Sequence, residues 1–217
     1  MIVYNFMKSN YFLFFLLLFI SFSTLHAQKE EGWVTKYDKD GLVIQLRGAK
    51  TTEYRAVMTV NADLKSCVAL LQDIESHPQF MTTVKSVQLL KVYNNKESLV
   101  YSVIDMPFPM GDKDLVSKAE FINKPAEKKV IVKLKSLPTA YPAKDYDRMK
   151  TADGQWIFET IGDNKTKVTY QLKFDESNAP NWVVNKFVVD NPKEVLLGFA
   201  NFVKKPKYKN ADIVWMR

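Results

Sequence analysis

The stretch YSVIDMPFPMGDKDLV, Tyr101 to Val116, places two apolar runs on either side of a proline-rich connection. Proline fixes its own φ and has no N–H to donate, so neither Pro107 nor Pro109 fits a central strand. One strand therefore ends here and another begins soon afterwards. The connection also carries Phe108 and Met110, where a plain turn would be polar. On an exposed turn these two side chains need an apolar partner, which would be the hollow that they seal or a lipid surface that they touch; the alternative is that Phe108 plugs the end of an ordinary core.

The first 27 residues have the order of a secretory signal peptide. Lys8 precedes the apolar run YFLFFLLLFI, and small and polar residues follow up to Ala27. We expect cleavage after Ala27 and export to the periplasm or the extracellular space. An uncleaved membrane anchor is the alternative, because the apolar run approaches the length of a membrane span.

The remaining residues, 28–217, have the size of a single domain with its own core. The leader holds one lysine and no acid, so its removal lowers the formal net charge from +7 to +6. Cys67 is the only cysteine, which excludes an intramolecular disulfide. The lysines mostly alternate with apolar residues along predicted strands instead of gathering in one patch, so we expect no nucleic-acid binding. We expect the protein to be a monomer.

Period-two alternation predicts about eight antiparallel strands with one solvent-facing side. In KVIVKLK, Lys129–Lys135, Val130, Val132 and Leu134 share one face. In TKVTYQLKF, Val168, Tyr170, Leu172 and Phe174 do the same. The other predicted strands are Leu42–Arg47, Glu53–Val60, Val84–Tyr93, Ser98–Ile104, Leu115–Phe121 and Gln155–Ile161. Asp38-Lys39-Asp40-Gly41 predicts a hairpin turn before the first of them.

Two segments switch to helical spacing. Leu64, Cys67, Val68 and Leu71 recur at i, i+3, i+4 and i+7, with Asn61 as the expected N-cap. The second segment is Asn181–Lys205, in which Asn191-Pro192 either starts a further helix or kinks one long helix. This order predicts an α+β fold in which a curved antiparallel sheet wraps around the C-terminal helix and encloses an apolar cavity.

Catalytic constellations are nearly absent from the sequence. His77 precedes a proline at a predicted helix start, which is typical of a structural histidine. One histidine and one cysteine in the mature chain make a metal site improbable, and scattered glycines exclude phosphate-binding loops, so we expect no metal and no cofactor. The run KKPKYK, Lys204–Lys209, complements the dipole of a helix C-terminus or contacts anionic lipid headgroups.

Five segments in order resemble START domains, the helix-grip lipid-binding modules of the Bet v 1-like (SRPBCC) superfamily, and in particular secreted bacterial members. The segments are LLQDIESHPQFMTTVKSVQLL, SVIDMPFPMGDKDLV, DGQWIF, TKVTYQLKFD and APNWVVNKFV. The resemblance spans Trp33 to Lys204. The chain has Lys113-Asp114 where the family usually has Arg-Asp, and Phe80 where a tryptophan is common.

The resemblance implies non-enzymatic binding, with transfer as an extension, of a lipid, sterol-like molecule or isoprenoid. We expect the cavity and its gate to be formed by Tyr101, Val103, Asp105, Phe108, Met110, Arg148, Trp156, Tyr170, Trp182, Phe187 and Phe199. Phe108 and Met110, together with the Trp182–Phe187 face of the last helix, would form the gate. The alternative is a cyclase- or aromatase-like enzyme of the same superfamily, which would need inward-facing acid–base groups. The candidates for those groups are Asp105, Arg148, Tyr101 and Tyr170. A third option is a protein-binding module with a filled core.

Overall fold

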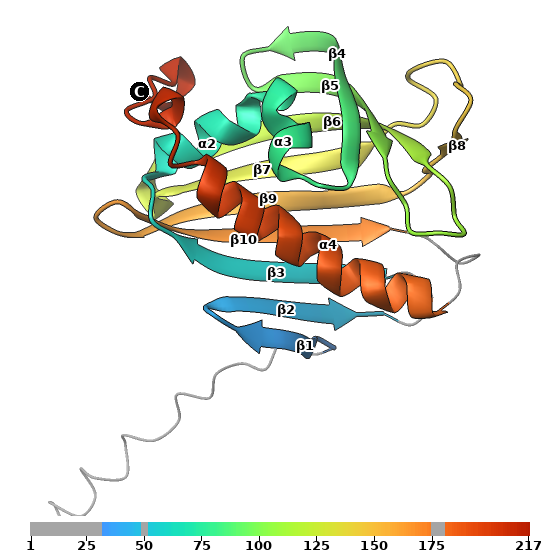
Figure 1. Cartoon of the computed structure of the whole chain (residues 1–217). Helices are drawn as coiled ribbons and strands as arrows, with labels where there is room; N and C mark the ends of the chain where they lie inside the picture. The colour runs from blue at the N-terminus through green and yellow to red at the C-terminus, as the bar shows by residue number, and fades with distance from the viewer. Residues whose placement is uncertain (1–31, 49–51, 175–180) are drawn as a thin grey trace, which may run out of the picture. The chain divides into compact units, whose positions relative to one another are not determined.

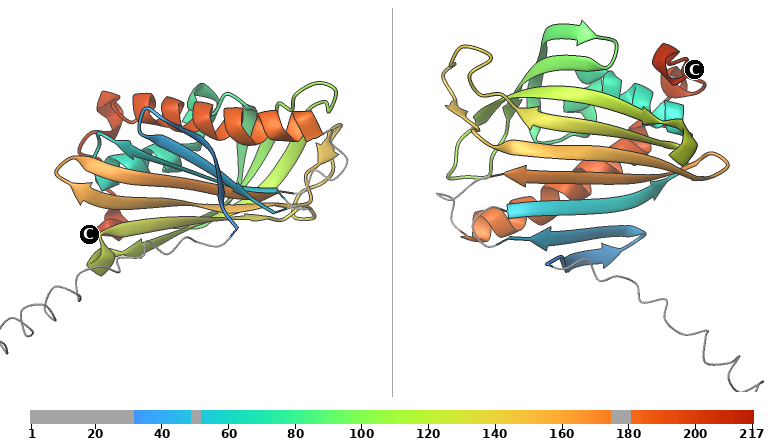
Figure 2. Two further views of the ribbon diagram at one scale, coloured as in Figure 1. Left: turned by 90° about the horizontal axis from the view of Figure 1, so that it is seen from below. Right: turned by 180° about the vertical axis from the view of Figure 1, so that it is seen from behind.

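The computed structural model describes residues 32–48, 52–174 and 181–217, and Gly32–Arg217 forms one compact unit. Within the described ranges ten strands form one sheet, and the helices lie on one face of it (Figure 1; Figure 2). No helix in these ranges combines the length and the apolar character needed to cross a membrane. The predicted signal peptide lies outside the described residues.

The strands and helices follow the predicted order. The strands are β1 (Val34–Lys39), β2 (Leu42–Arg47), β3 (Thr52–Val60), β4 (Val84–Asn94), β5 (Glu97–Ile104), β6 (Lys113–Lys124), β7 (Lys129–Ser136), β8 (Asp147–Arg148), β9 (Ala152–Gly162) and β10 (Lys165–Phe174). The α-helices are α2 (Leu64–Gln72), α3 (His77–Phe80) and α4 (Asn181–Phe202). Short 3-10 turns are η1 (Ile74–Ser76), η2 (Pro125–Glu127), η3 (Pro206–Tyr208) and η4 (Val214–Met216).

The sheet has the order β1-β2-β3-β10-β9-β7-β6-β5-β4, with every neighbouring pair antiparallel. The eight predicted strands are confirmed. The two that the sequence missed are the edge strand β1 and the two-residue β8, which pairs with β6 in parallel. The predicted hairpin turn is also confirmed, because Asp40 and Gly41 have φ of 55° and 74°, the positive values that a tight hairpin requires.

The second edge strand, β4, pairs irregularly with β5. Three register shifts interrupt the pairing, between Val84 and Ser86, between Leu89 and Lys91, and between Val92 and Asn94. Each bulge adds an unpaired residue and reverses the alternation of the strand beyond it. The bulges therefore bring onto the helix-covered side three residues that strict alternation would not place on one face: Val84, Leu89 and Val92.

The start of α2 differs from the predicted one, and α4 is a single long helix, as in one of the two predicted alternatives. Asp63, not Asn61, caps α2, because its Oδ1 accepts a hydrogen bond from the Ser66 N–H at 2.8 Å. At the C-terminus the structure shows one helix from Asn181 to Phe202, with Pro192 inside it. The missing proline N–H costs a backbone hydrogen bond. Burial of the apolar face of α4 against the sheet and α3 offsets that cost.

A glycine sets the distance between α4 and α3. A Cβ on Gly198 would lie 2.3 Å from the carbonyl oxygen of Phe80, closer than real Cβ atoms approach. The Phe80 ring in turn contacts Phe199 at 5.8 Å between ring centroids. The short α3 helix thus packs directly on α4, and the two helices cover one part of the sheet (Figure 1).

Candidate ligand cavity

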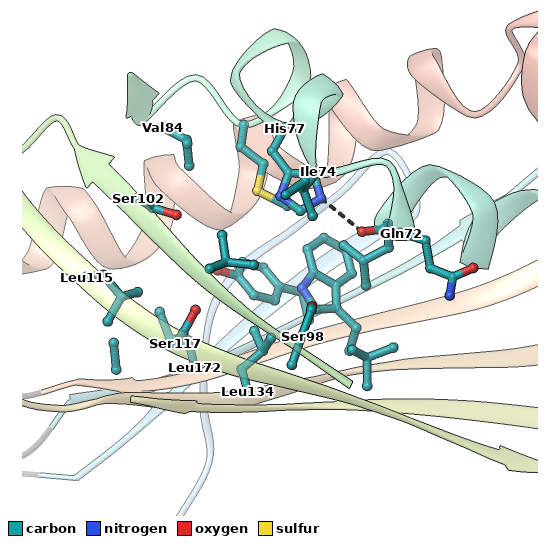
Figure 3. A pocket seen from close by; sticks show the side chains of 18 of the residues that line it. Gln72, Ile74, His77, Val84, Ser98, Ser102, Leu115, Ser117, Leu134 and Leu172 are labelled. Carbon is teal, nitrogen blue, oxygen red and sulfur yellow. Dashed lines mark hydrogen bonds between the residues drawn. The ribbon is translucent and has the colours of Figure 1, made fainter. Parts of the chain in front are cut away.

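A cavity of about 320 Å³ lies between the helix-bearing face of the sheet and the helices (Figure 3). This is near the lower end of the roughly 300–1,000 Å³ usual for small-molecule sites. The sheet lines it from β4 to β7 and from β9 to β10, while α2, η1, α3 and α4 line it from the other side. The predicted fold, a curved sheet and a terminal helix around a hollow, is confirmed.

Aromatic rings form one wall of the cavity. Trp156 of β9 stacks on Tyr170 of β10 with 4.3 Å between ring centroids, and Phe187 of α4 meets Phe174 edge-on at 5.8 Å. All four rings line the cavity, and all are buried. Phe199 lies behind them, packed on Trp156 at 5.4 Å, and does not reach the cavity surface. The wall therefore offers flat apolar surface to a ligand.

Three serines lie on the β5–β6 part of the cavity wall, among apolar neighbours. Ser98 and Ser102 lie on β5, and Ser117 on β6 is paired with Val100 between them (Figure 3). Diagonal neighbours on adjacent strands are about 7–8 Å apart. Within the described ranges none of the three hydroxyls makes a hydrogen bond to the protein. This wall therefore presents polar groups that a ligand or water can satisfy.

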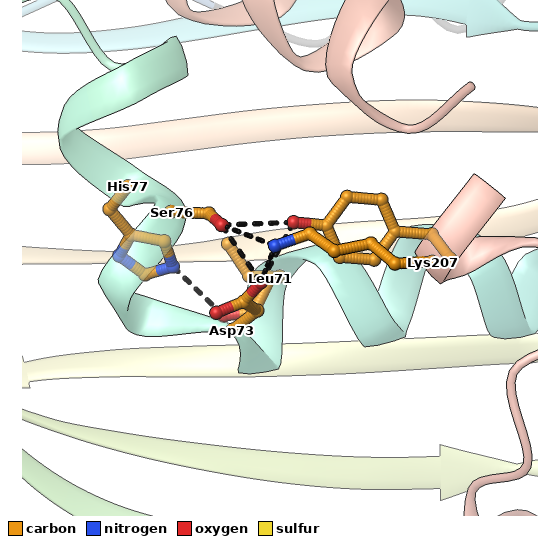
Figure 4. Close-up of polar contacts among 6 residues, drawn as sticks. Leu71, Asp73, Ser76, His77 and Lys207 are labelled. Atoms are coloured by element: carbon orange, nitrogen blue, oxygen red, sulfur yellow. Dashed lines mark hydrogen bonds and ion pairs between the residues drawn. The ribbon is translucent and has the colours of Figure 1, made fainter. Parts of the chain in front are cut away.

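His77, the first residue of α3, also lines the cavity. Its Nε2–H donates to the carbonyl oxygen of Leu71 at 2.9 Å, which leaves Nδ1 as an acceptor (Figure 4). Burial lowers the pKa of His77 below its usual value and outweighs the opposing effects of the Leu71 carbonyl and Asp73. The ring is therefore neutral at pH 7. The sequence placed His77 correctly at a helix start but gave no sign that it faces a cavity.

Ionised side chains are confined to one end of the cavity. Apart from His77, the titratable acid or base groups that line it among the described residues are Lys96, Glu97 and the Tyr170 hydroxyl. Lys96 and Glu97 belong to the β4–β5 hairpin, whereas burial raises the pKa of Tyr170 and keeps it neutral. At the α4 end, Thr83 donates a hydrogen bond to Asn191 at 3.1 Å. The interior is thus apolar with a few neutral polar groups.

Of the eleven predicted cavity or gate residues, Trp156, Tyr170 and Phe187 line the cavity. Tyr101 and Val103 do not, because they lie on the opposite face of β5, in a separate apolar cluster with Leu99 and Val116. The residues of β5 that line the cavity are those at 98, 100, 102 and 104, together with Glu97 at the start of the strand. The strand is apolar on both faces, so its alternation does not say which face is inward.

Arg148 also belongs to the outer face and not to the cavity. Its Nε and Nη2 donate to the two carboxylate oxygens of Asp114 at 2.7 Å each, and Asp114 is completely buried. The guanidinium further donates to the carbonyls of Pro138, Tyr141 and Pro142 at 2.8 to 3.0 Å. This ion pair fastens the connection between β7 and β8 onto β5 and β6.

The proline-rich connection stays outside the cavity. Met110 packs on the core without lining the cavity, and Phe108 is 87% exposed, so Phe108 neither seals the hollow nor plugs a core. Trp182 is 60% exposed, and the side chains of residues 183–186 lie outside the described part of the structure. Asp105 is exposed as well, with a carboxylate oxygen 3.2 Å from the Lys85 Nζ.

The four acid–base groups considered for a cyclase are not brought together. Tyr170 faces the cavity, whereas Tyr101 and Arg148 lie on the outer face and Asp105 is in solvent. Within the described ranges no three of the His, Cys, Asp and Glu side chains are placed to hold a metal ion. The cavity geometry thus favours binding over acid–base chemistry by these groups.

Residues 21–207 match the family model of the START domain. An uncharacterized protein of Pseudomonas aeruginosa is 32% identical over 180 residues, which cover 81% of this chain and 88% of that protein. The structure is similar to a STAR-related lipid transfer protein of Xanthomonas axonopodis, with a TM-score of 0.71, 23% identity and coverage of 81% of this chain and 100% of the other. It is also similar to an aromatase/cyclase of Streptomyces, with a TM-score of 0.55, 12% identity and coverage of 71% and 94%. The two structural likenesses concern the fold.

Proposed function

This chain belongs to the START domain family, and from that premise we propose that it binds one uncharged hydrophobic molecule in its cavity and releases it unchanged. The observation that carries the proposal is the distribution of polarity around the cavity. The interior consists of apolar side chains and neutral polar groups, and the ionised lining residues Lys96 and Glu97 are at one end.

The neutral interior selects against a charged ligand group. An ionised group moved from water into an apolar site costs several kcal/mol unless a counter-charge meets it. The described lining offers no such counter-charge beyond the β4–β5 hairpin. Hydroxyl or carbonyl groups can instead bond to Ser98, Ser102 and Ser117, whose hydroxyls have no partner in the described protein. A lipid, sterol-like molecule or isoprenoid with such groups meets these requirements.

Cavity filling tests the proposal. Ser117→Phe places a ring in the cavity, so we expect the affinity for the neutral probe N-phenyl-1-naphthylamine to fall at least about tenfold. Ser86→Phe is the matched control, since Ser86 is exposed on β4 and does not line the cavity. Fluorescence titration of both variants and the wild type gives the affinities. Probe binding that is equal in all three proteins would refute binding in this cavity.

The natural ligand and the absence of chemistry need a separate measurement. Native mass spectrometry of the purified protein, followed by organic extraction, is expected to recover one small hydrophobic molecule. The extracted compound, incubated with fresh protein, should return with unchanged mass. A changed mass would favour the alternative, an enzyme of the cyclase or aromatase type, for which the likeness of fold to the Streptomyces protein is the supporting observation.

We further propose that the protein works outside the cytoplasm. The support is the order of Lys8, the apolar run and the small and polar residues within residues 1–27. N-terminal sequencing of the protein from the periplasmic fraction and the culture medium is expected to begin at Gln28. A chain that keeps Met1 and sediments with membranes would instead establish the uncleaved anchor.

A further inference from the structure

The exposed part of the cavity lining is concentrated in one place. Among the lining residues, the exposed ones are Leu89, Val92, Asn94, Asn95 and Lys96, all on β4 or its turn into β5. The other lining residues are buried or half-buried. The cavity therefore opens to solvent along the β4–β5 hairpin, at the opposite end of β5 from the proline-rich connection at residues 105–112.

The opposite rim of this opening is fixed by a polar cluster. Gln72 and Ile74 line the cavity on either side of Asp73. Asp73 Oδ2 accepts hydrogen bonds from Lys207 Nζ at 2.6 Å and from Tyr208 Oη at 2.8 Å, and Ser76 joins the same cluster (Figure 4). The segment after α4 thus holds the junction of α2 and η1 in place.

The hairpin side of the opening is held less firmly. β4 is an edge strand, so one side of its backbone has no neighbouring strand, and three bulges interrupt its pairing on the other side. Regions with sparse backbone pairing and high exposure open at lower cost than core strands. We therefore expect the hairpin, and not the α2–η1 side, to move when a ligand passes.

The chemistry of the hairpin suits the surface of a lipid bilayer. Leu89 and Val92 are 46% and 59% exposed, and Tyr93 beside them is exposed as well. The Lys91 Nζ lies 4.8 Å from the centre of the Tyr93 ring, and Lys96 lies over Trp215 at 5.9 Å. Neither lysine forms an ion pair with a carboxylate in the described ranges. Aromatic and aliphatic side chains flanked by lysines are typical of segments that enter the headgroup region of membranes.

The charges around the opening indicate that the membrane surface is anionic. Lys118 and Glu97 next to the hairpin neutralise each other at 2.6 Å, so Lys91 and Lys96 leave the hairpin itself positive. Across the opening, Lys204, Lys205 and Lys209 are exposed on the segment that Lys207 and Tyr208 attach to Asp73. Lysines on both rims complement anionic headgroups.

We infer that the β4–β5 hairpin, through Leu89, Val92, Tyr93, Lys91 and Lys96, docks the protein on an anionic phospholipid bilayer with the cavity opening toward the lipid. The inference rests on the proposed function, because it gives the bound molecule its route between cavity and membrane. It assigns membrane contact to a different surface from the predicted gate at Phe108.

Vesicle sedimentation tests the inference without any cavity ligand. Mature protein is mixed with vesicles of phosphatidylcholine containing about 30% phosphatidylglycerol, or of phosphatidylcholine alone, at low salt. We expect binding to the anionic vesicles only, weakened by added NaCl. Leu89→Ser/Val92→Ser should weaken it at least about fivefold, and Lys91→Gln/Lys96→Gln on the order of tenfold. Phe108→Ser, which removes a more exposed apolar side chain elsewhere, should bind like the wild type.

Circular dichroism establishes that each variant is folded, and the lysine pair keeps the test valid if the serine pair does not fold. Absence of binding to anionic vesicles, or full binding by both hairpin variants, would overturn the inference. A loss confined to Phe108→Ser would overturn it in favour of the proline-rich connection. Failure of N-phenyl-1-naphthylamine to bind in solution would refute the proposed function while leaving the sedimentation result to stand by itself.

Discussion

The two faces of the β5–β6 strand pair are both apolar, yet the structure uses them differently. On the outer face Tyr101, Val103 and Val116 are buried under the connection that follows β7. Asp114, the one buried carboxylate among the described residues, is fully paired with Arg148. On the inner face apolar side chains alternate with the three serines around a hollow. The outer face is a closed core that stabilises the fold, whereas the inner face keeps polar groups available.

This difference predicts that substitutions on the two faces affect different properties, namely stability on the outer face and ligand affinity on the inner face. Changes on the outer face should alter the free energy of unfolding and leave the affinity for a cavity ligand nearly unchanged. Changes on the inner face, such as Ser117→Phe, should alter the affinity for a cavity ligand and leave the free energy of unfolding nearly unchanged. The variants that follow test this separation in order of the expected loss of stability.

The largest loss of unfolding free energy is expected for Arg148→Met. It leaves the carboxylate of Asp114 buried without a counter-charge and frees three backbone carbonyls of the covering connection. Loss of one partner of a buried ion pair costs about 3–5 kcal/mol of unfolding free energy. Urea denaturation measures this loss, and titration with N-phenyl-1-naphthylamine of the folded variant should give wild-type affinity.

Lys85→Met is the control for Arg148→Met. Lys85 also pairs with two carboxylates, those of Asp105 and Asp112, but in solvent. Exposed ion pairs contribute little to stability, so we expect little change. Equal destabilisation by the two substitutions would mean that the outer face is not the closed core described above.

The sequence predicted the regular parts of the two faces and failed where both faces of a strand are apolar. In β7 and β10, lysines mark the solvent side, and the predicted inward residues Val132 and Tyr170 do line the cavity. In β5, Leu99 to Ile104 contains no charge, so the assignment of Tyr101 and Val103 to the cavity had no physical basis and was wrong. Only tertiary packing decides between such faces.

Bulges and tertiary contacts account for the other differences. The shifts in β4 place Leu89 and Val92 on one face, and bulges leave no clear signature in a single sequence. The cavity role of His77 depends on where α3 lies against α4, which Gly198 and Phe80 determine over a separation of more than a hundred residues. The exposure of Phe108 likewise depends on the position of the whole connection and not on its composition.

Gly198→Ala should have the second largest effect on stability, because the added methyl group would push α3 away from α4. The added Cβ would meet the backbone carbonyl of Phe80, which cannot turn aside as a flexible side chain does. Overpacking of this kind costs about 1–3 kcal/mol. Since His77 and Met81 of the same segment line the cavity, probe affinity should change together with thermal stability. Gly162→Ala is the control, as its nearest neighbour lies 4.0 Å from the added atom, and both quantities should stay at wild-type values.

Tyr208→Phe should destabilise less, by about 1–2 kcal/mol, through the loss of hydrogen bonds to Asp73 and Ser76. The loss should also depend on pH. Burial raises the pKa of Asp73, but hydrogen bonds from Lys207, Ser76 and Tyr208 outweigh it and hold the pKa below its usual value of 3.8. The ionised cluster therefore stabilises the fold at neutral pH, and this contribution disappears as the pH falls below about 4.

Urea denaturation of wild type and Tyr208→Phe at pH 7 and near pH 3 measures that dependence. The difference in unfolding free energy should be largest at pH 7 and smaller in acid. A difference that grows on acidification would show that the Tyr208 hydroxyl does not act through the Asp73 carboxylate. The α2–η1 rim would then not be fixed as we infer.

Phe108→Ser should have the smallest effect on stability, and it tests whether the proline-rich connection controls access to the inner face. Phe108 is 87% exposed, so its loss should change the unfolding free energy by less than about 0.5 kcal/mol. It belongs to neither the outer core nor the cavity lining. If the opening lies along the β4–β5 hairpin, the rate at which the protein takes up N-phenyl-1-naphthylamine from vesicles should equal that of the wild type. A slower uptake at unchanged stability would mean that the connection between β5 and β6 controls access to the inner face after all.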